Sequence, residues 1–181
     1  QVVYLDTNDN GQLDVGSVTF ASAAGDMLIQ DESMIRSEIL VDQQLGPLTD
    51  VNVEIDLEHS WDADLAIYLV SPAGSRIELV SDVGTAHANF SNTTFDDEAS
   101  ISISQGTPPY QGSFRPLEPL AGLDSELAPG SWVLEVHDRG KQDEGILHGW
   151  SLTLAHSEIS TITGEDGWYT LDDVPAGSHF V

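Results

Sequence analysis

The sequence, 181 residues long, predicts an all-β protein built from two packed sheets. Apolar residues recur at every second position through much of the chain, which is the period of a strand with one buried face. Clusters of Gly, Pro, Asn, Asp and Ser separate these runs, as turns do between antiparallel strands. No segment has a convincing apolar stripe at the helical period, so we expect strands to make up the regular structure.

The expected strands follow one another along the chain. The segment Met34–Val41 would also suit a short helix, but its neighbours favour a strand. Trp132 and Trp150 occupy apolar phases of two later strands, which favours core packing over sugar stacking. The other alternating runs lie at 51–57, 65–70, 77–79, 101–103, 132–136 and 150–154.

Two connections are predicted in more detail. In the turn Ser71–Gly74, a proline with a fixed φ and a permissive glycine reverse the chain. Prolines at positions 108, 109, 116 and 119 interrupt the later stretch Pro108–Pro119. Because proline cannot donate to a ladder, we expect this stretch to be a long ordered loop that lies on the sandwich.

The composition excludes several classes of function. The chain has 31 acidic and 5 basic residues and a formal net charge of −26. Nucleic-acid binding needs clustered Lys and Arg, so a nucleic-acid partner is excluded, and an anionic membrane surface is equally unfavourable. There is no cysteine and no apolar run of membrane-spanning length, so we predict neither disulfides nor a membrane span. Bound cations, a high-salt environment or simple solvation of surface carboxylates would offset the self-repulsion of so many acidic groups, and solvation accounts for most of them.

Four segments between Val51 and Leu154 form an ordered pattern. They read VNVEIDLEHSWDADLAIYLVSPAGSRIELV, NFSNTTFDDEA, PYQGSFRP and PGSWVLEVHDRGKQDEGILHGWSLTL. Together they resemble the P domain (Homo B domain) of subtilisin-like proprotein convertases. The resemblance implies a jelly-roll-like β-sandwich over residues 18–155, export, and often calcium. It also implies a place behind a subtilisin-like serine protease domain, whose folding and stability the module would support.

The two chain ends resemble a different family. The stretch VVYLDTNDNGQLDVGS at the start and TITGEDGWYTLDDVPAGSHFV at the end are similar to the start and end of SdrD B-like and Cna-B repeats. The resemblance implies a small companion β-sandwich, prealbumin-like, formed by residues 1–17 plus 156–181 and interrupted by the P-like insert. We then expect Val2–Leu5 to pair in one sheet with Trp168–Leu171. Two truncated neighbouring repeats are the alternative.

The first candidate metal site is the loop DTNDNGQLD. Its oxygen-bearing side chains have the spacing of an EF-hand-like loop, with Gly11 where the chain must turn sharply. Position twelve is Ser17 where a Glu is expected, which removes a bidentate ligand, and no helix flanks the loop. An Asx-turn hairpin without metal is the alternative. The candidate calcium ligands are Asp6, Asn8, Asn10, Gln12 and Asp14.

The second candidate calcium site lies inside the P-like segment. Three acidic loops there could clamp a sandwich edge, and each aspartate could equally be a turn cap. The family pattern favours Asp64, Asp97, Asp138 and Asp143 as ligands.

No catalytic residue and no organic cofactor site is predicted. The chain lacks a Gly-x-Ser-x-Gly elbow and a His-Glu-x-x-His helix, and Ser71 and Ser131 have ordinary structural contexts. We therefore expect a non-catalytic, calcium-stabilised module, secreted or at the cell surface of a bacterium, whose partners are a protease catalytic domain or neighbouring surface repeats. The alternatives are a structural spacer and an adhesin-type module that binds carbohydrate or protein. Glycan binding would need an exposed set of aromatic rings, for which the candidates are Trp61, Tyr68, Tyr110 and Phe114.

Overall fold

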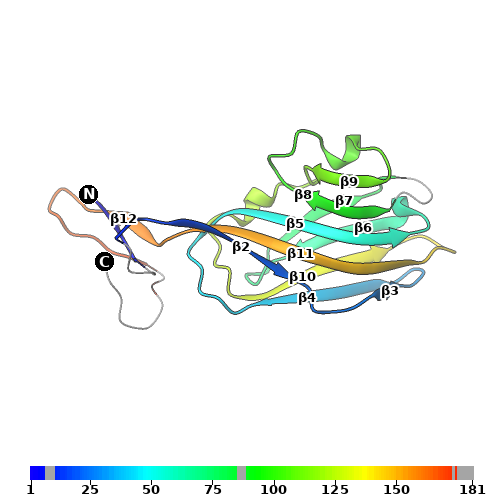
Figure 1. Cartoon of the computed structure of the whole chain (residues 1–181), viewed down its shortest axis with the longest axis horizontal. Helices are drawn as coiled ribbons and strands as arrows, with labels where there is room; N and C mark the ends of the chain where they lie inside the picture. Colours follow the sequence, from blue (N-terminus) through cyan, green and yellow to red (C-terminus); the bar gives the residue numbers. More distant parts are fainter. Residues whose placement is uncertain (7–10, 85–88, 173, 175–181) are drawn as a thin grey trace.

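Two β-sheets packed face to face form the main body of the molecule (Figure 1). The computed structural model describes residues 1–6, 11–84, 89–172 and 174. The four-stranded sheet has the order β4 (Met34–Val41), β10 (Gly130–Asp138), β6 (Leu65–Val70), β7 (Arg76–Ser81). The six-stranded sheet has the order β2 (Val15–Ala21), β11 (Gly145–Ser157), β5 (Leu48–His59), β8 (Phe90–Phe95), β9 (Tyr110–Phe114), and β3 (Met27–Ile29) also pairs with β11. The predicted all-β sandwich is confirmed.

Short 3-10 helices connect some of these strands. They are η1 (Asp62–Asp64), η2 (Ile103–Gln105) and η3 (Leu120–Leu123). Within the described ranges, no helix is long and apolar enough to cross a membrane.

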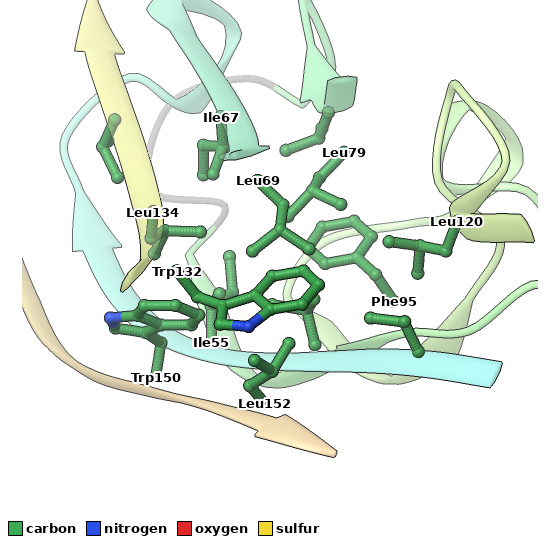
Figure 2. Packing of buried hydrophobic residues seen from close by; sticks show 14 of the residues in the cluster. Ile55, Ile67, Leu69, Leu79, Phe95, Leu120, Trp132, Leu134, Trp150 and Leu152 are labelled. Atoms are coloured by element: carbon green, nitrogen blue, oxygen red, sulfur yellow. The ribbon is translucent and has the colours of Figure 1, made fainter. Parts of the chain in front are cut away.

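The core lies between the two sheets. Along β5 the odd-numbered residues Val51–Leu57 are almost completely buried, as the period-two pattern predicts. Figure 2 shows Trp132 and Trp150 among aliphatic side chains from both sheets, including Leu69 of β6 and Leu152 of β11. Both indoles are buried, so their predicted role in core packing is confirmed.

Both indole N–H groups have partners inside the core. The Nε1–H of Trp132 donates to the carbonyl of Ala128 at 2.9 Å. That of Trp150 donates to the Ser37 hydroxyl at 2.9 Å. These bonds satisfy the polar edge of each ring, which would otherwise be costly to bury.

The prediction that Pro108–Pro119 contains no strand is wrong. Residues Tyr110–Phe114 form β9, which pairs in parallel with β8 at the edge of the six-stranded sheet. The prolines flank this strand and do not interrupt it, and the rings of Tyr110 and Phe114 are buried against the core. An edge strand needs a partner on one side only, so five residues between prolines suffice.

The expected strand at 101–103 is also not formed. Ser102 makes a single bridge with Arg115, and η2 begins at Ile103. The predicted turn Ser71–Gly74 is confirmed, with the amide of Gly74 donating to the carbonyl of Ser71 at 3.0 Å. Gly74 has a φ of 94°, which the absence of a side chain permits.

The first strand pairs with the segment that follows β11, but through a different strand from the one predicted. β1 (Val2–Tyr4) pairs antiparallel with β12 (Ser160–Ile162), while Trp168–Leu171 forms no strand. β12 follows β11 closely in the chain, and the Leu5 amide donates to the carbonyl of Ile159 at 2.8 Å. The residues next to β1 are therefore those of β12 and not Trp168–Leu171. The strands β2 and β11 extend to Val15 and Ser157, beyond the expected boundaries at 18 and 155.

Candidate functional site

Two loops meet at the end of the sandwich where β5 finishes. One runs from His59 through η1, and the other joins β10 to β11. The backbone ties them together, because the Arg139 amide donates to the carbonyl of Asp64 at 2.9 Å and the Ser60 amide donates to that of Glu144 at 3.2 Å. The ladder positions of β10 beside β6, and of β11 beside β5, therefore fix which side chains can meet here.

Asp64 lies directly over the second loop. A Cβ atom built on Gly140 would be only 1.7 Å from Oδ2 of Asp64, so this carboxylate fills the space that a side chain at 140 would need. Partial burial raises the pKa of Asp64, and the charges of Asp138 and Asp143 raise it further, against smaller opposing effects of His59 and Arg139. Asp64 is therefore repelled by two other predicted ligands, Asp138 and Asp143.

Asp138 is the most enclosed of these groups. Its side chain and that of His59 are both 0% exposed, with His59 Nε2 at 3.4 Å from Asp138 Oδ2. The other oxygen, Oδ1, accepts a hydrogen bond from the Gly140 amide at 2.9 Å. Oδ2 has no hydrogen-bond donor within the described part of the chain, so a buried carboxylate oxygen there has unused capacity to bind.

Asp143, in the loop between β10 and β11, ties that loop to the one that follows β5. Its Oδ1 accepts a hydrogen bond from the Ser60 hydroxyl at 2.6 Å. A shallow cavity of about 420 Å³ adjoins it, lined by Asp31, Ser60, Gln142, Asp143 and Glu144. A cation at this end would enter an acidic environment.

The residues present meet part of the demands of calcium. Carboxylate oxygens are the donors that calcium prefers, and Asp138 offers one that is buried and unbonded. However, among the described residues no three acidic or histidine side chains converge closely enough to hold one ion. Calcium at this end would have to take backbone carbonyls and water as further ligands, with small movements of Asp64 and Asp143.

Asp97 does not join this group. Its two carboxylate oxygens accept hydrogen bonds from the amides of Leu120 at 3.1 Å and Ala121 at 2.8 Å, so it caps η3 from another loop. Its charge acts on Asp50 and Asp124, whose pKa values are raised, chiefly by burial. Asp50 lies near the start of β5, the opposite end from His59, so the expected group of four is divided between two ends of the molecule.

The N-terminal loop contains a second acidic group. Oδ2 of Asp6 accepts a hydrogen bond from the Gly11 amide at 2.7 Å, and Gly11 has a φ of 73°, consistent with the sharp turn that the spacing predicts. Gln12 is exposed and Asp14 is half-buried, while Asn8 and Asn10 lie outside the described residues.

Glu158 is a further acidic residue beside this loop that the sequence reasoning missed. It is 4% exposed, and its Oε2 accepts a hydrogen bond from the Asp14 amide at 3.0 Å. The pKa of Tyr4 is raised by burial and then by the charges of Asp6, Glu158 and Asp14, so all three carboxylates act on one phenol. No local spacing could reveal this, because Glu158 is 144 positions from Asp14.

The four predicted aromatic rings do not form one exposed set. Tyr110 and Phe114 are core residues: the Tyr110 ring stacks on Phe90 and meets Phe114 edge to face, while Trp61 is 43% exposed. The ring of Tyr68 lies under the guanidinium group of Arg76, 3.3 Å from its centroid. Trp61 is therefore the exposed ring of the four, while the other three are buried or half-buried.

The serines considered as nucleophiles have structural contacts. Ser71 is buried in its turn and its hydroxyl accepts a hydrogen bond from the Ser75 amide at 3.2 Å. The hydroxyl of Ser131 hydrogen-bonds to the carboxylate of Glu38.

Comparison with known proteins gives matches over the residues that form the sandwich. A family model described as the proprotein convertase P-domain matches residues 48–154, which run from β5 to β11. Proprotein convertase subtilisin/kexin type 6 of Rattus norvegicus is 29% identical over 118 residues, covering 62% of this chain and 10% of the relative. The calcium-dependent protease of Trichormus variabilis is 24% identical over 139 residues, covering 76% of this chain and 18% of the relative. The chain thus spans a small part of the curated relatives it matches.

Among solved structures, a serine protease of Aeromonas sobria in complex with its chaperone matches with a TM-score of 0.47 and 23% identity. The match covers 86% of this chain and 27% of that one. A second structure, of a serine protease of Aeromonas sobria, gives a TM-score of 0.47 and 21% identity.

Proposed function

The chain belongs to the proprotein convertase P-domain family, and from this membership we propose that it is a non-catalytic module of a secreted or cell-surface protein that contains a subtilisin-like serine protease domain. The observation that supports this most is that the family match covers β5 to β11, which supply strands to both sheets of the sandwich. The module would stabilise the protease domain by packing beside it.

The test compares the longer protein that contains this chain with a version from which residues 1–181 are deleted. We expect deletion to lower the melting temperature of the protease domain and to shorten its active half-life. A protease domain that folds, melts and cleaves unchanged without these residues would contradict the proposal. The isolated chain is expected to cleave no peptide substrate under the same conditions.

We also propose that calcium binds at both acidic loops and stabilises the module. At the sandwich end the ligands would include Asp64, Asp138 and Asp143, and the support is the unbonded buried oxygen of Asp138 together with the raised pKa of Asp64. A divalent cation bound between these carboxylates would attract each of them and offset their mutual repulsion. That one relative is named a calcium-dependent protease agrees with this proposal.

At the N-terminal loop the ligands would include Asp6, Asn8, Asn10, Gln12 and Asp14. Ser17 stands at the position where an EF-hand loop has a bidentate glutamate, and Glu158 lies next to Asp14 in the fold. We propose that Glu158 supplies the acidic ligand that the loop itself lacks.

Thermal unfolding with calcium and then with a chelator tests both sites. Because calcium binds the folded state, a hundredfold excess over its Kd should stabilise by about 2.7 kcal/mol per site. D64N and D143N should reduce the calcium-dependent rise in melting temperature, and E158Q should reduce it independently.

D97N is the matched control for these variants, since Asp97 caps η3 away from both loops. It should lower the melting temperature equally with calcium and with chelator. A wild-type protein whose melting temperature is the same at millimolar calcium and in chelator would eliminate both calcium sites, without bearing on the role beside a protease.

The relation of the chain ends to SdrD B-like repeats stays a prediction. The pairing of β1 with β12 supports a proposal that residues 1–17 and 156–181 belong to one small unit interrupted by the P-like sandwich.

A further inference from the structure

The strand β4 is an edge of the four-stranded sheet. It pairs with β10 on one side, in an unbroken register from Val41 opposite Gly130 to Met34 opposite His137. Within the described part of the chain its other side has no ladder partner. It is eight residues long and contains neither proline nor a bulge, two of the features that prevent an edge from pairing with another chain, and its two charged residues are of opposite sign.

Its outward face combines apolar and charged residues. Met34 is 46% exposed and Leu40 is 70% exposed, both large apolar side chains on a strand of a very acidic protein. Between them on the same face lie Arg36 and Glu38, also exposed. The alternate residues Ser37, Ile39 and Val41 are buried in the core.

The sequence of β4 is complementary to its own reverse. When MIRSEIL is laid antiparallel against a second copy with Ser37 opposite Ser37, Arg36 faces Glu38 and Met34 faces Leu40, each pair occurring twice. Ile35 faces Ile39 on the core side. Opposite charges and paired apolar side chains directly across two strands are the contacts that stabilise an antiparallel ladder.

We propose that β4 is a self-association edge at which two copies of this chain pair antiparallel about Ser37. The two four-stranded sheets then join into one continuous sheet across a two-fold axis, as an isologous interface requires. The Arg36 guanidinium, already bonded to the Glu135 carboxylate opposite it on β10, has further N–H donors for Glu38 of the second copy.

The net charge of −26 on each copy opposes this association at low ionic strength. The dimer is therefore measured at about 0.5 M NaCl, where the Debye length falls to roughly 4 Å and long-range repulsion is screened. Sedimentation equilibrium from about 10 µM to about 1 mM should detect a weak, concentration-dependent dimer, as expected of a small interface.

A charge exchange tests the register. E38R puts two arginines opposite each other at both symmetric positions and should raise the dimer Kd at least about tenfold. The double variant R36E/E38R restores opposite charges across the axis and should recover most of the association. L40E, at a site that does not contact the core, should also weaken the dimer.

The matched control is E54R, because Glu54 is exposed on β5 of the other sheet and its replacement changes the net charge by the same amount. E54R should leave the dimer Kd unchanged or lower it slightly. A chain that stays monomeric at 1 mM, or a dimer that E38R and E54R affect equally, overturns the proposal. Circular dichroism of each variant shows whether its monomer is folded.

Discussion

Replacing Trp132 by phenylalanine tests the centre of the sandwich. Trp132 is 0% exposed and lies among aliphatic side chains (Figure 2). Its Nε1–H donates to the carbonyl of Ala128, which is also buried. Phenylalanine retains one aromatic ring but lacks the N–H and about two buried carbons. It also cannot fill the whole space, because a packed core relaxes only partially around a smaller side chain.

The expected cost follows from these losses. Two buried carbons contribute about 1.6 kcal/mol at roughly 0.8 kcal/mol each. The lost hydrogen bond, which leaves the Ala128 carbonyl without this donor, adds about 1–2 kcal/mol. We therefore expect W132F to lower the free energy of unfolding by about 2–4 kcal/mol, or the melting temperature by roughly 4–16 °C for a chain of this size.

Urea unfolding followed by circular dichroism at 25 °C measures this change without relying on indole fluorescence. The control is W168F, the same substitution at a residue that is 80% exposed, which should change stability by less than about 0.5 kcal/mol. A loss below about 1 kcal/mol in W132F, or an equal loss in both variants, would show that the core is not organised around Trp132.

Two further predictions concern the outer face of the four-stranded sheet and a tight approach of two backbones. Burial acts to raise the pKa of Glu135, but hydrogen bonds from Arg76 and Arg36 outweigh it and hold the pKa below 4.5. The stability that this carboxylate contributes is thus present above about pH 4.5 and is lost as the pH falls through its folded pKa. In urea unfolding we expect E135Q to be less stable than wild type at pH 7. Between pH 5 and pH 3 we expect it to lose less stability than wild type does. G46A should lower the free energy of unfolding by at least about 1–3 kcal/mol in the same assay, because the new Cβ would lie 1.7 Å from the backbone oxygen of Ser157. Unchanged stability would show that the two backbones do not approach this closely.

Most of the strands could be predicted because their information is local. In β5 the alternation from Val51 to Leu57 is the direct consequence of one buried face, and the same holds for β4, where Met34–Val41 is observed with the predicted bounds. The turn at Ser71–Gly74 is likewise local, since the proline and the glycine act on their own φ angles.

The wrong predictions concern segments whose structure depends on which other strand they can pair with. β9 exists because β8 offers an edge and because the rings of Tyr110 and Phe114 have a core to enter, neither of which the surrounding prolines reveal. Trp168–Leu171 has the composition of a strand, yet β1 is already paired with the closer Ser160–Ile162.

The candidate site shows the same division. The family resemblance pointed to Asp64, Asp138 and Asp143 as candidates, and in the fold the charges of Asp138 and Asp143 do act on Asp64. Asp97 has the same chemistry but lies beside η3. The pairing of the strands determines which loops share an end of the sandwich, and residue type alone does not reveal that pairing.

The sequence by itself determined the all-β class, the buried positions of Trp132 and Trp150, and an acidic surface unsuited to nucleic acid. Periodicity and composition are summed over neighbouring residues, so they survive without knowledge of the fold. Only the tertiary structure decided that Glu158 lies beside Asp14, that Asp138 is enclosed with His59, and that β4 is the edge strand of the four-stranded sheet. These are contacts between distant residues, and their geometry depends on strand order and register, which no single stretch of the chain encodes.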